Sequence, residues 1–272
     1  MNTTLTEDSF SRQSFLGENS QSIIERTVVG IAGLGGGGSH IAQQLAHIGF
    51  LNFVIYDGDH IEASNLNRLV GATEEDVRSK TPKVEIARRL ITGIRPKAIV
   101  EKIQSKWQEA PNALKRCDVV FGCVDGFDQR RQLEATTRRY LIPLIDIGMD
   151  VHTPDEGRPV ITGQVILSMP GHPCMHCMGF LNEGNLAKEA GEYGDAGINP
   201  QVIWSNGVLA STAVGLAVDL ITDWSKSLRN SVYLSYRGAV HSLTEDPTFA
   251  YAPKVCKHYP LEETGAPNFT KL

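Results

Sequence analysis

A glycine-rich turn and the acid that follows it have the types and spacing of a nucleotide-binding site. The turn GLGGGGS places Gly33, Gly35 and Gly38 in a G-x-G-x-x-G arrangement, which lets backbone N–H groups approach phosphates. Asp57 follows Gly38 by 19 residues, where such folds place the acid that binds a ribose hydroxyl. These features alone fit NAD and ATP equally.

Polar residues further along the chain favour a triphosphate. A Rossmann-type glycine turn lacks the lysine of a P-loop, so cations for a triphosphate must come from elsewhere. Arg68 and Lys83 are the predicted cations, and Asn65 lies close to them in the sequence. Asp125 ends a predicted strand and is the predicted Mg²⁺ ligand. We therefore expect ATP with Mg²⁺ rather than NAD.

A second group of residues has metal-ligand spacing. Cys174 and Cys177 form a C-x-x-C, and Cys256 and His258 follow in VCKHYP. These four residues predict a Cys₃His zinc site. A site that has lost its metal, and a site completed by His176, remain alternatives. The odd total of five cysteines favours a reducing compartment over a disulfide framework.

The first half of the chain is predicted to alternate between strands and helices, and these elements must position the nucleotide-binding residues. The predicted strands cover residues 27–33, 52–57, 98–103, 117–125 and 142–148. The predicted helices cover 39–49, 81–96 and 128–140, the second with Thr81 as its cap and Pro82 as its first helical residue. The pattern predicts an α/β fold, a doubly wound, Rossmann-like and mostly parallel sheet. In such a sheet the carboxyl ends of the strands gather the candidate residues.

The regular alternation of strands and helices ends after Gly148. We expect an antiparallel strand over 159–169, a compact turn at the C-x-x-C, and a mobile loop over 181–200. A long apolar helix over 199–224, a strand over 231–238 and an irregular tail from Asp246 complete this antiparallel C-terminal extension. We expect a single domain over 1–272, with a nucleotide-binding half (26–150) and a carrier-binding half (151–272).

Composition excludes some classes of function. Of 272 residues, 41% are hydrophobic and 21% charged, and the net charge is −5. This balance is ordinary for a globular enzyme and argues against general binding to nucleic acid or to membrane surfaces. We expect no apolar run of bilayer length and no signal peptide in the polar N-terminus. The predicted location is the cytoplasm.

Seven sequence pieces together resemble one family. They are SRQ, GLGGGGS, DGDHIEASNLNR, TPKVE, CVDGFDQRRQL, IPLIDIG and CMHC, and they occur in family order over about residues 10–180. The chain resembles the ThiF/MoeB/HesA family, whose members share the adenylation fold of ubiquitin-activating enzymes. The resemblance implies ATP-dependent adenylylation of a carrier protein's C-terminal carboxylate, usually the glycine end of a ubiquitin-like or sulfur-carrier protein.

The resemblance also implies roles for particular residues. Those given to nucleotide and Mg²⁺ binding are Gly35, Gly36, Asp57, Asp59, Asn65, Arg68, Lys83 and Asp125. Those given to catalysis are Arg12, Arg68, Lys83 and Asp125. Arg12 would reach the nucleotide of the partner subunit in a homodimer, and the apolar helix is the predicted interface.

The chain also departs from the family pattern. Members that form a thioester carry a cysteine in the crossover loop, but residues 178–255 contain none. Leu69 replaces a common glutamine, and Lys80 replaces a glycine. We therefore expect an activating enzyme in which either the acyl-adenylate is the end product, passed to another thiol or sulfide, or Cys256 or another thiol takes an unusual role. Adenylation of a tRNA base or short peptide, and a non-catalytic nucleotide-binding scaffold, are the competing functions.

Overall fold

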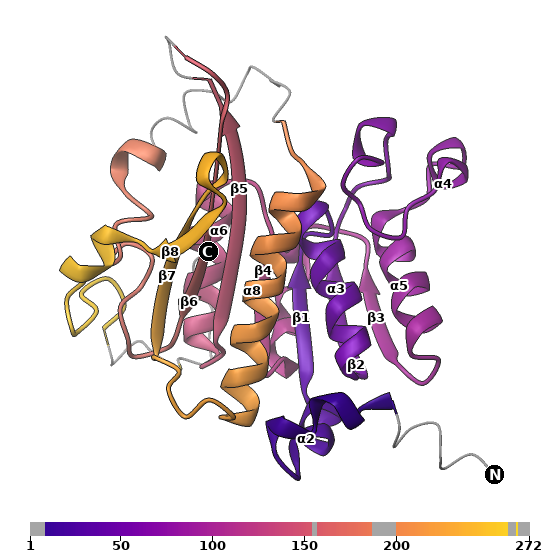
Figure 1. The fold of residues 1–272 in the computed structure, drawn as a ribbon, viewed down its shortest axis with the longest axis horizontal. Helices are drawn as coiled ribbons and strands as arrows, with labels where there is room; N and C mark the ends of the chain where they lie inside the picture. Colours follow the sequence, from indigo (N-terminus) through magenta and orange to yellow (C-terminus); the bar gives the residue numbers. More distant parts are fainter. Residues whose placement is uncertain (1–8, 154–156, 187–199, 261–264, 266–272) are drawn as a thin grey trace.

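The computed structural model describes residues 9–153, 157–186, 200–260 and 265. One eight-stranded mixed sheet runs through it in the order β3-β2-β1-β4-β5-β6-β7-β8 (Figure 1). The strands are β1 (Val28–Ala32), β2 (Asn52–Tyr56), β3 (Ile99–Ile103), β4 (Val119–Gly122), β5 (Leu144–His152), β6 (Val160–Ser168), β7 (Ser231–Arg237) and β8 (Ser242–Glu245). Neighbours from β3 to β5 are parallel, and neighbours from β5 to β8 are antiparallel.

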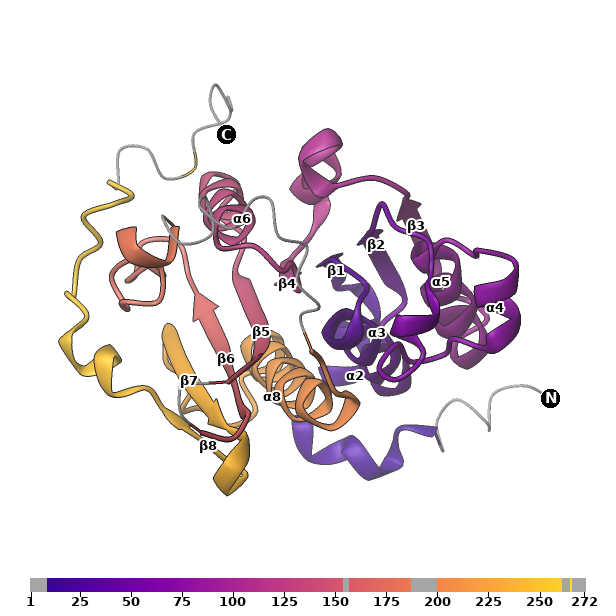
Figure 2. The same cartoon turned by 90° about the horizontal axis from the view of Figure 1, so that it is seen from above.

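Helices cover both faces of the sheet. α3 (Gly36–Ile48), α5 (Lys83–Ile94) and α8 (Ile203–Thr222) lie on one face, and α6 (Phe127–Arg139) lies on the other (Figure 2). The shorter helices are α2 (Ser20–Arg26) and α4 (Glu74–Arg78). The 3₁₀ turns are η1 (Ser11–Leu16), η2 (Ala63–Asn65), η3 (Trp107–Glu109), η4 (Pro111–Arg116), η5 (Gly238–Val240) and η6 (Pro247–Tyr251).

Each face of the sheet has its own hydrophobic core. The larger core joins the sheet to α3, α5 and α8. The second core lies on the α6 face and includes Tyr56, Trp107 and Leu133. Strands β1 and β4 are apolar without alternation because both of their faces are covered. This double covering leaves the carboxyl ends of the parallel strands as the place for a ligand.

Strand β5 joins the two halves of the molecule. Its first residues pair in parallel with β4, Leu144 lying opposite Val120. All nine of its residues pair antiparallel with β6, from Leu144 opposite Ser168 to His152 opposite Val160. The sheet is therefore continuous across residue 150. The predicted α/β class, with a parallel part followed by an antiparallel extension, is confirmed.

Several local expectations were wrong. Helix α5 begins at Lys83 with Pro82 as its N-cap, because the Thr81 backbone is engaged in the preceding loop: it donates to Asp76 O and accepts from the Ile61 N–H. Strand β8 went unpredicted, and the tail from Asp246 contains the turn η6 rather than irregular chain alone. Residues 187–199 of the predicted mobile loop lie outside the described residues.

The expectation about apolar length was also wrong. Helix α8 has 20 residues and is long and apolar enough to cross a bilayer. The buried side of α8 packs against α3, α2, β5 and β6. A central helix of a folded core passes the same test of length and composition, so this finding is weak evidence for a membrane span.

Candidate functional site

The glycine turn joins β1 to α3, and a Cβ at three of its positions would clash with neighbouring atoms. Gly33 has a positive φ of 92°, and a Cβ there would lie 2.4 Å from the carbonyl oxygen of Cys123. A Cβ at Gly38 would lie 1.9 Å from Gly33 O, and one at Gly36 would lie 2.5 Å from Asn206 Nδ2. The glycines thus let the turn lie directly against the ends of β4 and α8.

Asp57 ties the end of β2 to this turn. Its Oδ2 accepts a hydrogen bond of 2.7 Å from the backbone N–H of Leu34, and its Oδ1 accepts one of 2.9 Å from that of Asp59. Burial raises the pKa of Asp57 above its usual value, and the nearby Lys83 ammonium acts in the opposite direction. Asp57 therefore orders the turn as well as facing the place predicted for a ribose.

The predicted cations come from the segment between β2 and α5. Lys83, the first residue of α5, places Nζ 2.8 Å from Asp59 Oδ2, and only 12% of its side chain is exposed. Arg68 donates from Nη1 to Ser64 O at 2.6 Å. Asn65 accepts the Glu62 N–H through Oδ1 at 3.1 Å. Each of these side chains is held in place by neighbours in the same segment.

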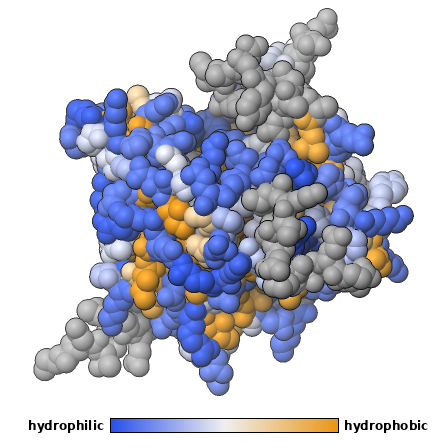
Figure 3. All heavy atoms as spheres, turned by 180° about the vertical axis from the view of Figure 1, so that it is seen from behind, coloured by the Kyte–Doolittle hydropathy of each residue, from blue (hydrophilic) through white to orange (hydrophobic). Residues whose placement is uncertain are grey.

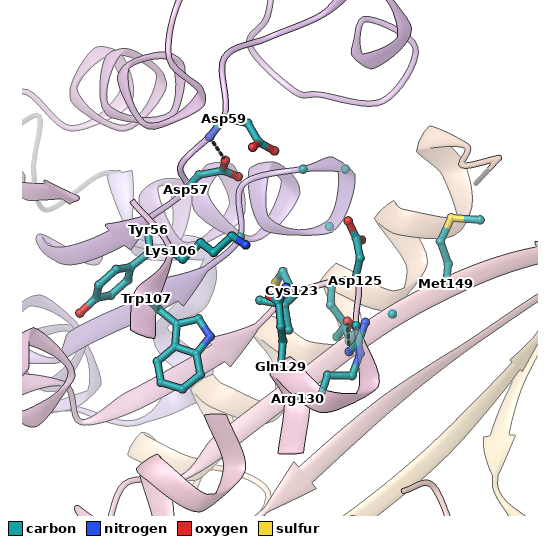
Figure 4. A pocket seen from close by; sticks show the side chains of 18 of the residues that line it. Tyr56, Asp57, Asp59, Lys106, Trp107, Cys123, Asp125, Gln129, Arg130 and Met149 are labelled. Atoms are coloured by element: carbon teal, nitrogen blue, oxygen red, sulfur yellow. Dashed lines mark hydrogen bonds between the residues drawn. The ribbon is translucent and has the colours of Figure 1, made fainter. Parts of the chain in front are cut away.

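A single cleft of about 1550 Å³ collects the predicted nucleotide residues. It is lined by Gly35, Gly36, Asp57, Asp59, Asn65, Arg68, Lys83 and Asp125. Figure 4 shows Asp57 and Asp59 on one side and Asp125 across the cleft from them. Pockets for a single small ligand have volumes of about 300–1,000 Å³. The cleft is therefore large enough for a nucleotide and part of a second molecule.

Sequence reasoning missed Arg130, which also lines the cleft. It forms a buried ion pair with Asp146 on β5 and donates to Ile147 O at 2.9 Å. Burial raises the pKa of Asp146 to about 6, against the opposing effect of Arg130. A signal was available, because Arg130, Glu134 and Arg138 are spaced by four residues and share one face of α6.

Arg12 lies outside the cleft of its own chain. It belongs to η1 and is exposed, and it is absent from the residues that line the cleft. Its neighbour Gln13 donates to Ile48 O at the C-terminal end of α3, whereas the glycine turn lies at the N-terminal end. A helix of 13 residues is about 20 Å long, so Arg12 and the glycine turn are at opposite ends of α3.

The four predicted metal ligands lie together. The ligand atoms of Cys174, Cys177, Cys256 and His258 all lie within 4.8 Å of one another. Sγ of Cys174 is 3.6 Å from Sγ of Cys177, which is 3.7 Å from Sγ of Cys256. His258 Nδ1 is 3.4 Å from the sulfur atoms of both Cys174 and Cys177. His176 stacks on the His258 ring at 5.0 Å instead of joining the group.

The spacing of these atoms fits a tetrahedral metal ion. A zinc–sulfur bond of about 2.3 Å gives a ligand–ligand edge of about 3.8 Å in a tetrahedron. Four of the six edges measure 3.4 to 3.7 Å, close to this value, and all six lie within 4.8 Å. Three sulfurs and one imidazole are also a donor set that zinc prefers. The residues therefore fit zinc, with His258 in the fourth position.

Helix α6 holds this cysteine turn in place. Glu134 is fully buried, and its Oε1 accepts from the Met175 N–H at 2.8 Å and from Ser168 Oγ at 2.5 Å. Arg138 donates to His172 O at 2.9 Å. The turn is thus bound to the helix whose first residues line the cleft.

A model of the ThiF family matches residues 10–254. The SAMP-activating enzyme E1 of Haloferax volcanii is 29% identical over 176 residues, which cover 63% of this chain and 61% of that protein. The molybdopterin-synthase adenylyltransferase of Escherichia coli K12 is 28% identical over 216 residues, covering 79% of this chain and 80% of that protein. The chain thus spans less than two thirds of the length of the Haloferax volcanii relative.

The fold also resembles a solved structure. E. coli MccB, determined with ATP, superposes with a TM-score of 0.70 at 20% sequence identity, covering 88% of this chain and 71% of that one. At this identity the likeness concerns the fold alone.

Proposed function

Because the chain belongs to the ThiF family, we propose that it is an adenylyltransferase that uses ATP to activate the C-terminal carboxylate of a ubiquitin-like or sulfur-carrier protein. The observation that carries this proposal is the single cleft that gathers the glycine turn, Asp57, Lys83, Arg68 and Asp125. The two relatives, an activating enzyme and an adenylyltransferase, agree with it.

The cleft is large enough to hold two substrates side by side. The glycine turn and Lys83 mark one part, and Met149, Gln164 and Phe180 line another. We assign the first part to the nucleotide and the second to the carrier's C-terminal tail. The carboxylate would then meet the α-phosphate between them, in the region of Asp125 and Arg130.

The reaction needs charge neutralisation more than proton transfer. A carboxylate oxygen forms a bond to the α-phosphorus, and the bond from that phosphorus to the bridging oxygen of pyrophosphate breaks. No proton moves, but two anions are brought together. Lys83 and Arg68 offset this charge from fixed positions, and positioning together with electrostatics supplies the rate enhancement. Arg130, fixed by Asp146, offers a further cation next to the carboxylate.

Two metal ions belong to the proposal. Asp125 offers a carboxylate at the edge of the cleft and would hold Mg²⁺, which when bound neutralises phosphate charge. Cys174, Cys177, Cys256 and His258 would hold Zn²⁺. A closed site with four protein ligands is structural, and this one would fasten the C-terminal tail to the turn after β6.

The position of Arg12 supports a homodimer. Exposed apolar side chains follow α8, with Trp204 and Val208 57% and 40% exposed near its start and Trp224 46% exposed beyond its end. Trp224 contacts Phe15 of η1 edge to face at 5.4 Å. The face of the molecule seen in Figure 3 is mainly hydrophilic with small separate apolar groups. A second copy packed on α8 and η1 would bring Arg12 towards the other chain's cleft.

The absence of cysteine from residues 178–255 bears on the product. We propose that the carrier adenylate is released to, or attacked by, another thiol or sulfide without a crossover-loop thioester. Burial raises the pKa of Cys117 to about 12 and keeps it a thiol, so it is a poor substitute nucleophile.

ATP–pyrophosphate exchange, with and without candidate carriers, tests the proposal. We expect carrier-dependent exchange that Asp125→Ala abolishes while the thermal unfolding temperature stays the same. Glu74→Ala, which removes an exposed carboxylate with 80% side-chain exposure outside the cleft, is the matched control. Calorimetry should detect the binding of ATP to the protein and no binding of NAD. Exchange with a short peptide but no carrier would favour the peptide alternative, and nucleotide binding without exchange would favour a scaffold.

A further inference from the structure

His258 is the exposed member of the four-residue metal group. Cys174 and Cys256 are buried and Cys177 is half-buried, whereas His258 is exposed. The ring of a metal-binding histidine is usually oriented by a hydrogen bond from its second nitrogen to a carboxylate, a carbonyl or water. Both polar contacts of the His258 ring use Nδ1, and Nε2 has no hydrogen-bond partner among the described residues. Another contact must therefore orient this ring.

His176 makes that contact from the cysteine turn. It lies between Cys174 and Cys177 in the sequence, and its ring stacks on the His258 ring with 5.0 Å between the centroids and 27° between the planes. Aromatic rings attract each other at such separations. The stack covers one face of the His258 ring while Nδ1 stays 3.4 Å from the sulfur atoms of Cys174 and Cys177. The orientation of the stacked ring is thus the one that a metal ion in the group needs.

The turn holds His176 more firmly than the tail holds His258. The N–H of Met175 donates to Glu134 Oε1 at 2.8 Å, and the Met175 side chain is fully buried. The carbonyl oxygen of His176 accepts from the Gly179 N–H at 3.1 Å. In the described part of the chain, His258 makes no backbone–backbone hydrogen bond. The ring on the turn therefore orients the ring on the tail, and not the reverse.

We propose that His176 is a positioning residue: it holds the His258 imidazole with Nδ1 facing the three sulfur atoms and thereby raises the affinity of the site for zinc. The inference rests on the proposed zinc site and is independent of the adenylylation reaction. His176 does not bind the ion itself, because its ring is not among the four groups whose ligand atoms gather. Without the stack, the exposed His258 ring would have to be ordered at the moment when the metal binds, and that loss of rotational freedom lowers affinity.

Competition between the full chain and a chromogenic chelator measures zinc affinity in the natural protein and its variants. His176→Ala should weaken zinc binding about tenfold, the lower end of the usual effect of removing a group that orients a metal ligand. His176→Phe keeps a ring that can stack, so its zinc affinity should stay within about twofold of the natural value. His172→Ala removes a half-buried histidine of the same segment outside the metal group and should leave the zinc affinity unchanged.

A double-mutant cycle shows whether His176 acts through His258. In a His258→Ala background three cysteines remain as ligands, and His176→Ala should weaken zinc binding no further. A similar loss in that background, or equal zinc affinity in the natural chain and His176→Ala, would overturn the positioning role.

The absorption spectrum of bound Co²⁺ reports the set of ligand atoms. It should be the same in the natural chain and in His176→Phe, and a changed spectrum would make His176 a ligand and overturn the inference. A natural chain that binds no zinc would overturn the zinc site and this inference together, and would leave the proposed adenylylation standing.

Discussion

Lys83 Nζ lies 2.8 Å from Asp59 Oδ2, so a carboxylate holds the proposed phosphate-binding cation at the cleft. The Lys83 side chain is 12% exposed and that of Asp59 is 73% exposed. The ammonium group is thus positioned by the buried stem and by an ion pair at the rim, before any nucleotide arrives.

Lys83→Met should therefore lower the rate of pyrophosphate exchange by about 10²- to 10³-fold, the usual effect of removing one fixed charge from the transition state. Stability should change by less than about 1 kcal/mol, because the ion pair has an exposed partner. Lys102→Met removes a lysine that pairs with Glu85 outside the cleft and serves as the control. Comparable losses of exchange activity in both variants would show that Lys83 has no specific role in the site.

Two glycine substitutions should separate folding from nucleotide binding. Gly38→Ala places a Cβ 1.9 Å from Gly33 O, whereas one at Gly35 meets nothing within 4 Å. We expect Gly38→Ala to lower the thermal unfolding temperature strongly, and Gly35→Ala to leave it nearly unchanged while weakening ATP binding. An unchanged ATP affinity in Gly35→Ala would place the phosphates elsewhere.

Metal analysis should find about one zinc per chain. Cys174→Ser should lose the metal and lower stability more than ATP affinity, because the cluster fastens the tail to the turn. Cys117→Ser changes a buried cysteine outside the cluster and should keep the zinc. Protein prepared without chelator and free of zinc would show that the cluster does not serve as a zinc site.

Mixing two inactive variants tests the homodimer. Arg12→Ala and Asp125→Ala should each lack exchange activity yet stay dimeric in sedimentation. Mixed together, they should recover part of the activity, because a hybrid dimer contains one cleft with both residues intact. Each variant mixed with itself is the control. A monomer at micromolar concentration, or no recovery, contradicts an Arg12 that acts on the partner subunit.

Asp76 gives a prediction about pH. Hydrogen bonds from Arg89, measured at 2.8 and 2.7 Å, hold the pKa of Asp76 well below its usual value of 3.8. As the pH falls, the Asp76 carboxylate of the unfolded chain therefore takes up a proton before that of the folded chain does. The stabilisation from the Arg89 contact is lost as the pH falls below about 4. Above pH 5, Asp76→Asn should cost about 2 kcal/mol of unfolding free energy.

Urea unfolding of the natural chain and of Asp76→Asn at a series of pH values measures the gap in unfolding free energy between the two proteins. The gap should narrow as the solution becomes more acidic than pH 4. Glu74→Gln, on the same helix but exposed, should show no gap at any pH. A gap that stays constant down to pH 3 would mean that the Arg89 contact does not lower the pKa of Asp76.

The parts of the site that local sequence encodes were predictable. The glycine turn and the charged residues at strand ends follow from spacing, because a strand and its following loop are set by neighbouring residues. Lys80 carried a signal as well: it stands where a glycine was expected and has a positive φ of 50°. Trp107 was not predictable as a cleft residue, because its position depends on packing between distant segments. The four-residue spacing of Arg130, Glu134 and Arg138 marks one face of α6, but it does not show that Arg130 meets Asp146 on β5. Strand β8 has only four residues, too few for a periodic pattern.

The order of the strands bears on synthesis of the chain at the ribosome. Strands β2 and β3 follow β1 closely, but the other neighbour of β1 is β4, Val119–Gly122. As the chain emerges, one edge of β1 has no partner until those residues leave the exit tunnel. An unpaired apolar edge is a site for aggregation. Slow translation between residues 33 and 118 therefore prolongs the stage at which a chaperone is most needed, whereas the β5–β6 pair can close as soon as it is made.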